Sequence, residues 1–291
     1  MTEERPEVGT NARPDLPLAV VVGAGGMAMA VARRLGRGHR LLIADKDEAH
    51  LARVAETMKV EGHDMRGCVC DVSDPAAVAR LAQMAADLGG PRAIAHVVGL
   101  SPSMGDWRAL MAVNWVGARL VADAFLPLVT QGTAALFVSS LAAHVFWPTE
   151  ERIALLEAPL TPDFLDKLEP AVGDDANSVI AYYDSKAALI RMCQRLAAVW
   201  GRRGGRIMSL SPGLIATPMG ALEFKNRPQK YTMLATTPIT REGTMLEIAD
   251  AVEFLLSDRA SFISGIDLLV DGGLTAAMRY PINQTETERT S

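Results

Sequence analysis

Tyr182 and Lys186 stand one helical turn apart in the stretch Tyr182-Tyr183-Asp184-Ser185-Lys186, which is expected to begin a helix. Because an α-helix has about 3.6 residues per turn, their side chains emerge on the same face. An ammonium group beside a phenol favours the phenolate and lowers the tyrosine pKa from about 10. Such a tyrosine can take a proton from an alcohol or give one to a carbonyl oxygen near neutral pH. The spacing alone is a weak motif, because a surface Tyr and a surface Lys can share it by chance.

A glycine-rich turn at 23–28 lies between a β-branched apolar run at 18–22 and a segment of helical character. This is the context that the dinucleotide-binding motif G-x-G-x-x-A requires. Gly23 permits the tight turn, Gly25 lets backbone N–H groups approach a pyrophosphate, and Ala28 keeps the helix close to the strand. The helix N-terminus then faces the phosphates. A turn that merely reverses the chain is the simpler alternative.

Asp45 ends the next apolar run, 39–44, and follows Gly25 by about 20 residues, the usual spacing for a ribose-binding acid. A carboxylate there can accept hydrogen bonds from both adenosine ribose hydroxyls and repels a 2′-phosphate. NAD is therefore favoured over NADP, and the neighbouring Lys46 weakens that inference without reversing it. A solvated acid at a strand end is the alternative interpretation.

Small or polar residues also follow three further apolar runs that read as strands. Asp71 and Val72 can flank an adenine through a hydrogen bond and an apolar contact, although Pro75 shortly after also marks an ordinary helix start. Gly99 leaves room for a cofactor ribose, and Ser140 places a hydroxyl where open α/β sheets bind ligands. The three runs span 67–70, 93–98 and 132–138.

The segments that must position these residues alternate between strands and helices. This alternation predicts an α/β fold, a Rossmann-type doubly wound parallel sheet of about seven strands with helices on both faces. Asn114 lies inside one long expected helix and needs hydrogen-bond partners if it is buried. His96 has no partner visible in the sequence, so we interpret it as structural. The remaining expected strands span 206–210 and 266–270, and the expected helices span 29–35, 47–59, 75–88, 107–126, 180–200 and 246–256.

The ordered set of motifs resembles the short-chain dehydrogenase/reductase family, single-domain type, over about 18–274. Any one piece is common, but the set in this order is specific. The matching pieces are the glycine turn at 23–28, Asp45, Asp71-Val72, Asn114, Ser140, Tyr182, Lys186, Ser211-Pro212-Gly213 and Val270-Asp271-Gly272-Gly273.

The resemblance implies a catalytic tetrad. Tyr182 would be the general acid/base, and Ser140 would hydrogen-bond the substrate oxygen. Lys186 would lower the tyrosine pKa and hold the nicotinamide ribose, while Asn114 would hold a water that links Lys186 to solvent. No metal is implied. The residues expected at an NAD cofactor, for which NADP is the less favoured alternative, are Gly23, Gly25, Gly26, Met27, Ala28, Asp45, Asp71, Val72, Gly99, Tyr182, Lys186, Pro212, Gly213 and Thr217.

Two local sequences depart from the family pattern. Val22 stands where the family usually has Thr, and the glycine loop that follows is one residue shorter. The strand that usually ends in Asn-Asn-Ala-Gly ends here in His96-Val97-Val98-Gly99, so Asn side chains are not expected there.

The segment between Ser140 and Tyr182 is longer than the family usually has, and an insertion is expected at about 145–178. Thr149 reads as one helix start, and Thr161 followed by Pro162 reads as another. The insertion resembles that of bacterial 3α-hydroxysteroid dehydrogenases/carbonyl reductases, where such a segment alters oligomer contacts. A lid or interface element and a neutral surface elaboration are the two interpretations. Pro170 and Gly173 are expected to close the second helix, with an apolar face of Phe164, Leu165 and Leu168.

Composition and charge exclude several classes of protein. The net charge of −5 and the pI near 5.6 offer no basic field for nucleic acid or an anionic membrane. The three cysteines form no metal spacing, which fits a reducing compartment, and no apolar run reaches the ~18 residues of a membrane span. We expect a cytoplasmic homodimer or homotetramer, with one domain at 17–278 between flexible tails at 1–16 and 279–291.

The leading hypothesis is an NAD-dependent oxidoreductase that transfers hydride between nicotinamide and a secondary alcohol or ketone. A catalytically silent NAD-binding regulator of the same fold is the alternative, and a sugar-nucleotide epimerase is a weaker one, because little chain follows Thr217. A substrate lid is expected at 218–243, and its apolar residues suit an apolar or steroid-like substrate. They are Met219, Leu222, Phe224, Tyr231, Met233 and Leu234.

Overall fold

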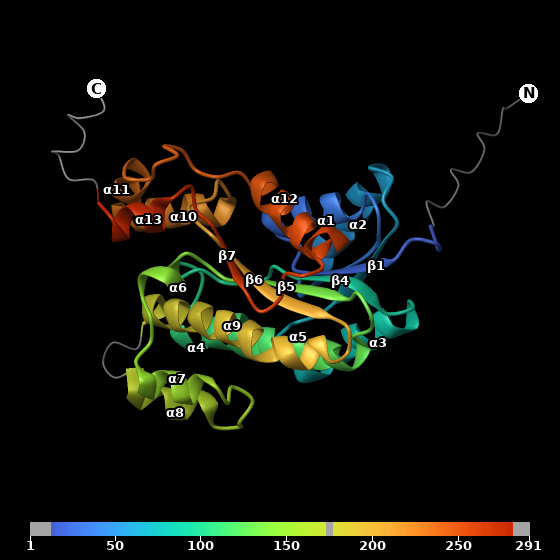
Figure 1. The fold of residues 1–291 in the computed structure, drawn as a ribbon, viewed down its shortest axis with the longest axis horizontal. Coiled ribbons are helices and arrows are strands. Elements are labelled where there is room, and N and C mark those ends of the chain that lie inside the picture. Colours follow the sequence, from blue (N-terminus) through green and yellow to red (C-terminus); the bar gives the residue numbers. More distant parts are fainter. Residues whose placement is uncertain (1–12, 173–176, 282–291) are drawn as a thin grey trace, which may run out of the picture.

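The computed structural model describes residues 13–172 and 177–281. Its seven strands are all parallel and form one sheet in the order β3-β2-β1-β4-β5-β6-β7 (Figure 1). The strand order reverses between β1 and β4, which is where sheets of this kind bind ligands. The predicted doubly wound sheet is confirmed. The strands are β1 Leu18–Val22, β2 Arg40–Asp45, β3 Met65–Val69, β4 Pro91–His96, β5 Ala134–Val138, β6 Arg206–Pro212 and β7 Asp267–Val270.

Helices cover both faces of the sheet, which is why its central strands are continuous apolar runs. Helices α1, α2 and α12 pack on one face, and α3, α4, α5 and α9 pack on the other (Figure 1). Two separate apolar cores result, one on each side of the sheet. These helices are α1 Gly26–Leu35, α2 Glu48–Val60, α3 Pro75–Asp87, α4 Trp107–Met111, α5 Ala118–Phe125, α9 Ser178–Gly201 and α12 Met245–Leu256.

The register of the sheet brings the predicted site residues to one edge. Val22 at the end of β1 is opposite Ala44 on one side and His96 on the other. Strand β4 ends earlier than expected, because the backbone N–H groups of Val97 and Val98 both donate to the Val22 carbonyl and turn the chain. Strand β3 is shifted from 67–70 to Met65–Val69, as an edge strand that pairs only with β2.

The helix expected at 107–126 is interrupted. A π-helical turn, Ala112–Gly117, separates α4 from α5, and a short 3₁₀ turn, Leu126–Leu128, follows α5. Length and composition alone would let the stretch Trp107–Leu128 cross a membrane, although no such apolar run was expected from the sequence. In the fold this stretch packs against α3 and α9 as a core helix.

The insertion forms two helices, α7 Glu150–Leu156 and α8 Phe164–Val172, on the outer side of α9 (Figure 1). Thr149 caps α7 as predicted. The expected start of the second helix is wrong, because Thr161 lies in a turn that precedes Phe164. Pro170 lies inside α8 and does not close it. Gly173 falls outside the described residues, and the apolar face of α8 is confirmed by buried Phe164 and Leu168.

The expected tails are shorter in the described chain. Arg13 donates its backbone N–H to the Asp64 carboxylate at 2.8 Å, so the chain is already attached to the domain before residue 16. At the other end, α13 (Leu274–Arg279) includes Arg279, whose guanidinium donates to the His144 carbonyl at 3.0 Å. The rest of the expected tails, 1–12 and 282–291, lies outside the described residues.

Candidate active site

A cavity of about 820 Å³ opens at the carboxyl ends of the strands. All fourteen residues predicted to bind the cofactor line it, as do Ser140, Tyr182 and Lys186. Asn114 is the one predicted site residue outside this lining. Segments far apart in the sequence therefore converge on a single space large enough for a dinucleotide and a small substrate.

Tyr182 and Ser140 both line this cavity. Tyr182, near the start of α9, is half-buried, and its hydroxyl interacts with Ser140, which follows β5. Burial raises the pKa of Tyr182 and nearby Glu223 adds to the rise, while the Ser140 hydrogen bond opposes both. The net shift in this structure is therefore upward, opposite to the net lowering that the Tyr182–Lys186 spacing predicted, while the influence of Lys186 on the phenol stays a prediction.

Lys186 lies beside Tyr182 as the one-turn spacing predicted, but its ammonium is directed elsewhere. Its Nζ is 5.7 Å from the centre of the Tyr182 ring and donates to the Val138 carbonyl at 3.0 Å. Burial lowers the pKa of Lys186 to about 8. The cation thus remains available at neutral pH, close to the tyrosine and at the floor of the cavity.

Asn114 lies behind Gly99 and helps to shape the cavity wall. Its amide oxygen accepts from the Leu100 N–H at 2.7 Å and its amide nitrogen donates to the Leu100 carbonyl at 2.9 Å, so the buried side chain is paired. A Cβ on Gly99 would come within 3.3 Å of both the Asn114 oxygen and the Lys186 Nζ. Only glycine leaves these two groups undisturbed at this position. The water-holding role of Asn114 stays a prediction.

The glycine turn has the form that its sequence predicted. Gly23 adopts a φ of +109°, and a Cβ there would meet the backbone nitrogen of Val98 at 3.0 Å. At Gly25, which caps α1, a Cβ would meet nothing within 4 Å, so the space beside this backbone is open to a ligand. Asp45 fastens the turn, because its Oδ2 accepts from the Ala24 N–H at 2.8 Å. These features fit a dinucleotide pyrophosphate.

Two predicted cofactor residues also have structural roles. Asp71 accepts hydrogen bonds from both the N–H and the hydroxyl of Ser73, which lower its pKa against the opposing effect of burial. Thr217 caps α10 (Pro218–Asn226) by accepting from the Gly220 N–H at 2.8 Å. Their contacts with adenine and nicotinamide stay predictions.

The predicted lid consists of α10 and α11, Gln229–Ala235, at one end of the cavity. Besides the expected apolar residues, α10 contributes Glu223, a buried carboxylate that the sequence interpretation missed. The available signal was a single acid within the otherwise apolar stretch Met219-Gly220-Ala221-Leu222-Glu223-Phe224.

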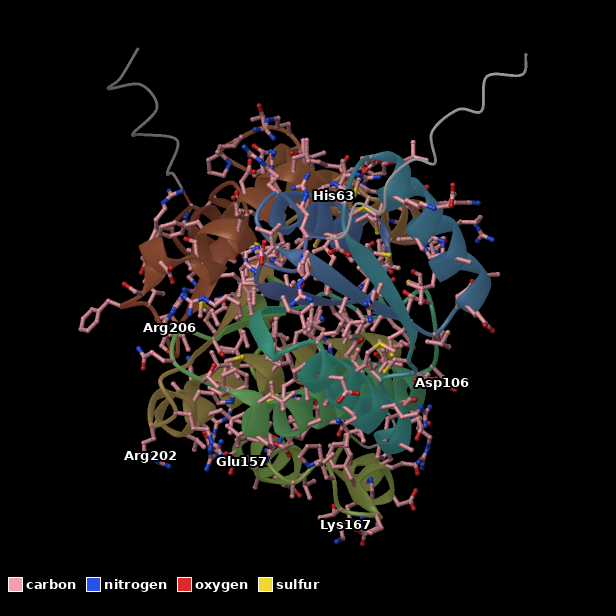
Figure 2. All side chains as sticks on the ribbon, turned by 90° about the vertical axis from the view of Figure 1, so that its right-hand side faces the viewer. His63, Asp106, Glu157, Lys167, Arg202 and Arg206 are labelled. Carbon is pink, nitrogen blue, oxygen red and sulfur yellow. The ribbon has the colours of Figure 1, made fainter. Side chains whose placement is uncertain are left out.

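The insertion does not form a wall of this cavity. Among the described residues, none between 146 and 178 lines it. The insertion instead packs behind the site, where the carbonyl of Leu156 accepts from the indole N–H of Trp115 at 2.9 Å. Figure 2 shows Glu157 and Lys167 of the insertion at the outer end of the molecule. Val145, at the start of the expected insertion, does line the cavity, but the two inserted helices do not, so the structure does not support the interpretation of the insertion as a lid.

Known proteins are similar to this chain in both sequence and fold. A family model described as enoyl-(acyl carrier protein) reductase matches residues 22–158 and 171–275, with its interruption inside the insertion. A short-chain dehydrogenase/reductase of Alternaria brassicicola is 32% identical over 88% of this chain and 95% of its own length. The 3-alpha-hydroxysteroid dehydrogenase/carbonyl reductase of Comamonas testosteroni is 33% identical over 58% of this chain and 67% of its own.

A solved structure supports the same assignment. The 3-alpha-hydroxysteroid dehydrogenase from Pseudomonas sp. B-0831, complexed with NADH, matches with a TM-score of 0.74 and 27% identity, covering 91% of this chain and 100% of that one. The chain belongs to the short-chain dehydrogenase/reductase family. It is an oxidoreductase that acts on an alcohol or carbonyl substrate with a nicotinamide cofactor, and the comparisons lend no support to a silent regulator.

Proposed function

We propose that the protein is an NAD-dependent dehydrogenase or ketone reductase for secondary alcohols and ketones with an apolar body. The observation that carries the proposal is that Tyr182, Ser140 and Lys186 line the same cavity as the glycine turn and Asp45. Proton transfer and dinucleotide binding thus share one space. The apolar side chains of α10 and α11 at the same cavity support an apolar substrate.

Each polar group has a task in this proposal. The Tyr182 phenolate takes the proton of the substrate hydroxyl during oxidation, and the phenol returns it to the carbonyl oxygen during reduction. Ser140 hydrogen-bonds the same substrate oxygen and stabilises its developing negative charge. The Lys186 cation favours the phenolate as the reaction proceeds. The nicotinamide supplies the hydride chemistry.

The preference for NAD rests on Asp45. This carboxylate lies at the end of β2, lines the cavity and is partly exposed. A ribose 2′-hydroxyl can donate to it, whereas a 2′-phosphate would be repelled. Resemblance to the NADH-bound 3-alpha-hydroxysteroid dehydrogenase supports the same preference.

The test is a panel of secondary alcohols, including cyclic alcohols and hydroxysteroids, with NAD and NADP as separate acceptors. Formation of the reduced cofactor is followed by its absorbance. We expect oxidation of apolar secondary alcohols with NAD, and slower oxidation with NADP. Tight NAD binding without turnover of any substrate would contradict the proposal.

A further inference from the structure

The cavity wall contains a buried carboxylate that the roles above do not use. Glu223 is 3% exposed, and its Oε1 accepts from the backbone N–H of Ser103 at 3.0 Å. Its Oε2 has no hydrogen-bond partner among the residues that the structure describes. Two cations lie within 4 Å of Oε2, but it accepts no hydrogen bond from the described residues, so this buried oxygen is suited to accept one from a group that enters the cavity.

Ser101 supplies a second free polar group on the same wall. It is 3% exposed, lines the cavity, and its hydroxyl has no hydrogen-bond partner within the described chain. Burial raises the pKa of Glu223, but the polar groups of Ser103 and Ser101 and the Lys230 charge outweigh burial and lower the pKa overall. Ser101 lies two residues before Ser103, whose N–H binds Glu223, and it lines the same cavity as Glu223. The Ser101 hydroxyl and the ionised Glu223 carboxylate can therefore each form a further hydrogen bond with a ligand in this cavity.

The surrounding charges favour a neutral ligand group. Arg227 Nη1 lies 3.8 Å and Lys230 Nζ 3.6 Å from Glu223 Oε2. A cationic group approaching this oxygen would meet both of these cations, and an anionic group would meet the carboxylate itself. A neutral group that both donates and accepts avoids either repulsion. A hydroxyl group has these properties.

We propose that Glu223 and Ser101 bind a second hydroxyl of the substrate, distinct from the hydroxyl or carbonyl that reacts at Tyr182. The second hydroxyl donates to Glu223 Oε2 and accepts from the Ser101 hydroxyl. The inference rests on the proposed dehydrogenase function and narrows its substrates to diols and hydroxyketones with an apolar body. Glu223 and Ser101 are then specificity residues, and α10 supplies both the apolar cover and this polar contact.

Matched alcohols test the proposal directly. The probes are cyclohexanol with cyclohexane-1,4-diol, and a saturated steroid monoalcohol with the steroid diol that has one more hydroxyl on its far ring. The wild type is assayed at saturating NAD. We expect its kcat/KM for at least one diol to exceed that for the matching monoalcohol by about ten- to one-hundred-fold. This is the range that one hydrogen bond to a charged group supplies.

Three variants isolate the contact. Glu223→Gln keeps an acceptor for the Ser103 N–H but places an amide NH₂ where Oε2 was, and Ser101→Ala removes the donor. Each single variant should reduce the ratio of kcat/KM for the diol to that for the monoalcohol at least ten-fold. The double variant should reduce this ratio by less than the product of the two single reductions, because both residues contact the same hydroxyl. Glu242→Gln is the matched control, since Glu242 interacts with Lys230 but does not line the cavity. It should leave the preference unchanged.

Measurements of turnover and of binding distinguish a failure of the hydroxyl site from a failure of the proposed dehydrogenase function. Equal kcat/KM for diols and monoalcohols in the wild type, or an unchanged diol preference in Glu223→Gln, would overturn the hydroxyl site while leaving the dehydrogenase intact. If no alcohol is oxidised, thermal shifts of the NAD-bound protein decide the matter. A diol-specific rise in Tm that Glu223→Gln abolishes would support the site and reject the redox function, and no such rise would reject both.

Discussion

Arg152 Nε of the insertion lies 3.5 Å from Asp184 Oδ2, and Asp184 stands between Tyr182 and Lys186 in the turn near the start of α9. Asp184 is fully buried, and neither carboxylate oxygen has a hydrogen-bond partner in the described part of the chain. Burial raises its pKa to about 6, although the Arg152 charge acts in the opposite direction. Among the residues that the structure describes, this is the insertion's one charged contact with this turn, and it lies behind the active site.

Replacement of Asp184 by Asn should stabilise the protein above pH 6. Because the folded-state pKa is raised from 3.8 to about 6, the folded protein holds this proton more tightly than the unfolded chain. The wild-type free energy of unfolding should therefore fall as the pH rises from about 4 to about 6, by about 1 to 3 kcal/mol from this group, and stay lowered above that window. Denaturant unfolding of wild type and Asp184→Asn between pH 4 and 8 measures the difference.

The difference between Asp184→Asn and wild type should vanish near pH 4, where the native carboxyl is already neutral. Asp166→Asn serves as the control, because Asp166 on α8 has an exposed side chain and, within the described part of the chain, pairs only with surface Arg108. A constant difference between Asp184→Asn and wild type at every pH would contradict the assigned titration.

Replacement of Tyr182 by Phe should lower kcat by about 10²- to 10⁴-fold, the usual contribution of a positioned general acid/base. The ring remains and only the hydroxyl is lost, so NAD should still bind. Steady-state rates and NAD titration by fluorescence measure the two effects. Tyr183→Phe is the matched control: Tyr183 also lines the cavity, but its ring packs against Phe146. Full activity in Tyr182→Phe would reject the mechanism.

Most of the fold was predictable because burial on both faces leaves a plain signature in the sequence. The β1 run is apolar and β-branched throughout, and the structure places its strand at the same residues, Leu18–Val22. Strand β3 was less well predicted, because an edge strand is half-exposed and loses that signature; Val69 is 47% exposed. The π turn around Asn114 was not predicted, since the helical pattern continues through it.

The site was predictable where order and spacing specify it, and not where distant segments meet. Gly23, Asp45 and Lys186 could be placed because each has a fixed relation to a strand end or a helical turn. Glu223 meets Ser103 only through tertiary folding, and no local pattern reports that contact. The raised pKa of Tyr182 was missed for a related reason: spacing identifies a neighbouring cation but does not measure burial.

Replacement of Asp45 by Asn should shift cofactor use toward NADP. The amide no longer repels a 2′-phosphate, so the ratio of kcat/KM for NADP to that for NAD should rise about ten-fold or more. The change also weakens acceptance from the Ala24 and Asp47 N–H groups, costing about 1 kcal/mol of stability. Rates with both cofactors, with Asp47→Asn as a neighbouring control, test this. An unchanged ratio would show that another group selects the cofactor.

The pH dependence of alcohol oxidation should report the environment of Tyr182. Burial first, and then the Glu223 charge, raise the pKa of Tyr182, so kcat/KM for oxidation should increase with pH as the phenolate forms. Lys186, whose pKa burial lowers to about 8, loses its charge at higher pH, and the gain should level off there.

Glu223→Gln removes a negative charge that favours the protonated phenol, so the rising limb of this profile should move to lower pH. Glu242→Gln should leave the limb in place, because Glu242 does not line the cavity. Cyclohexanol, which has no second hydroxyl, is the substrate for this experiment, so that the charge effect is measured apart from diol binding. A limb that moves to higher pH in Glu223→Gln would mean that the carboxylate acts on the tyrosine by some route other than its charge.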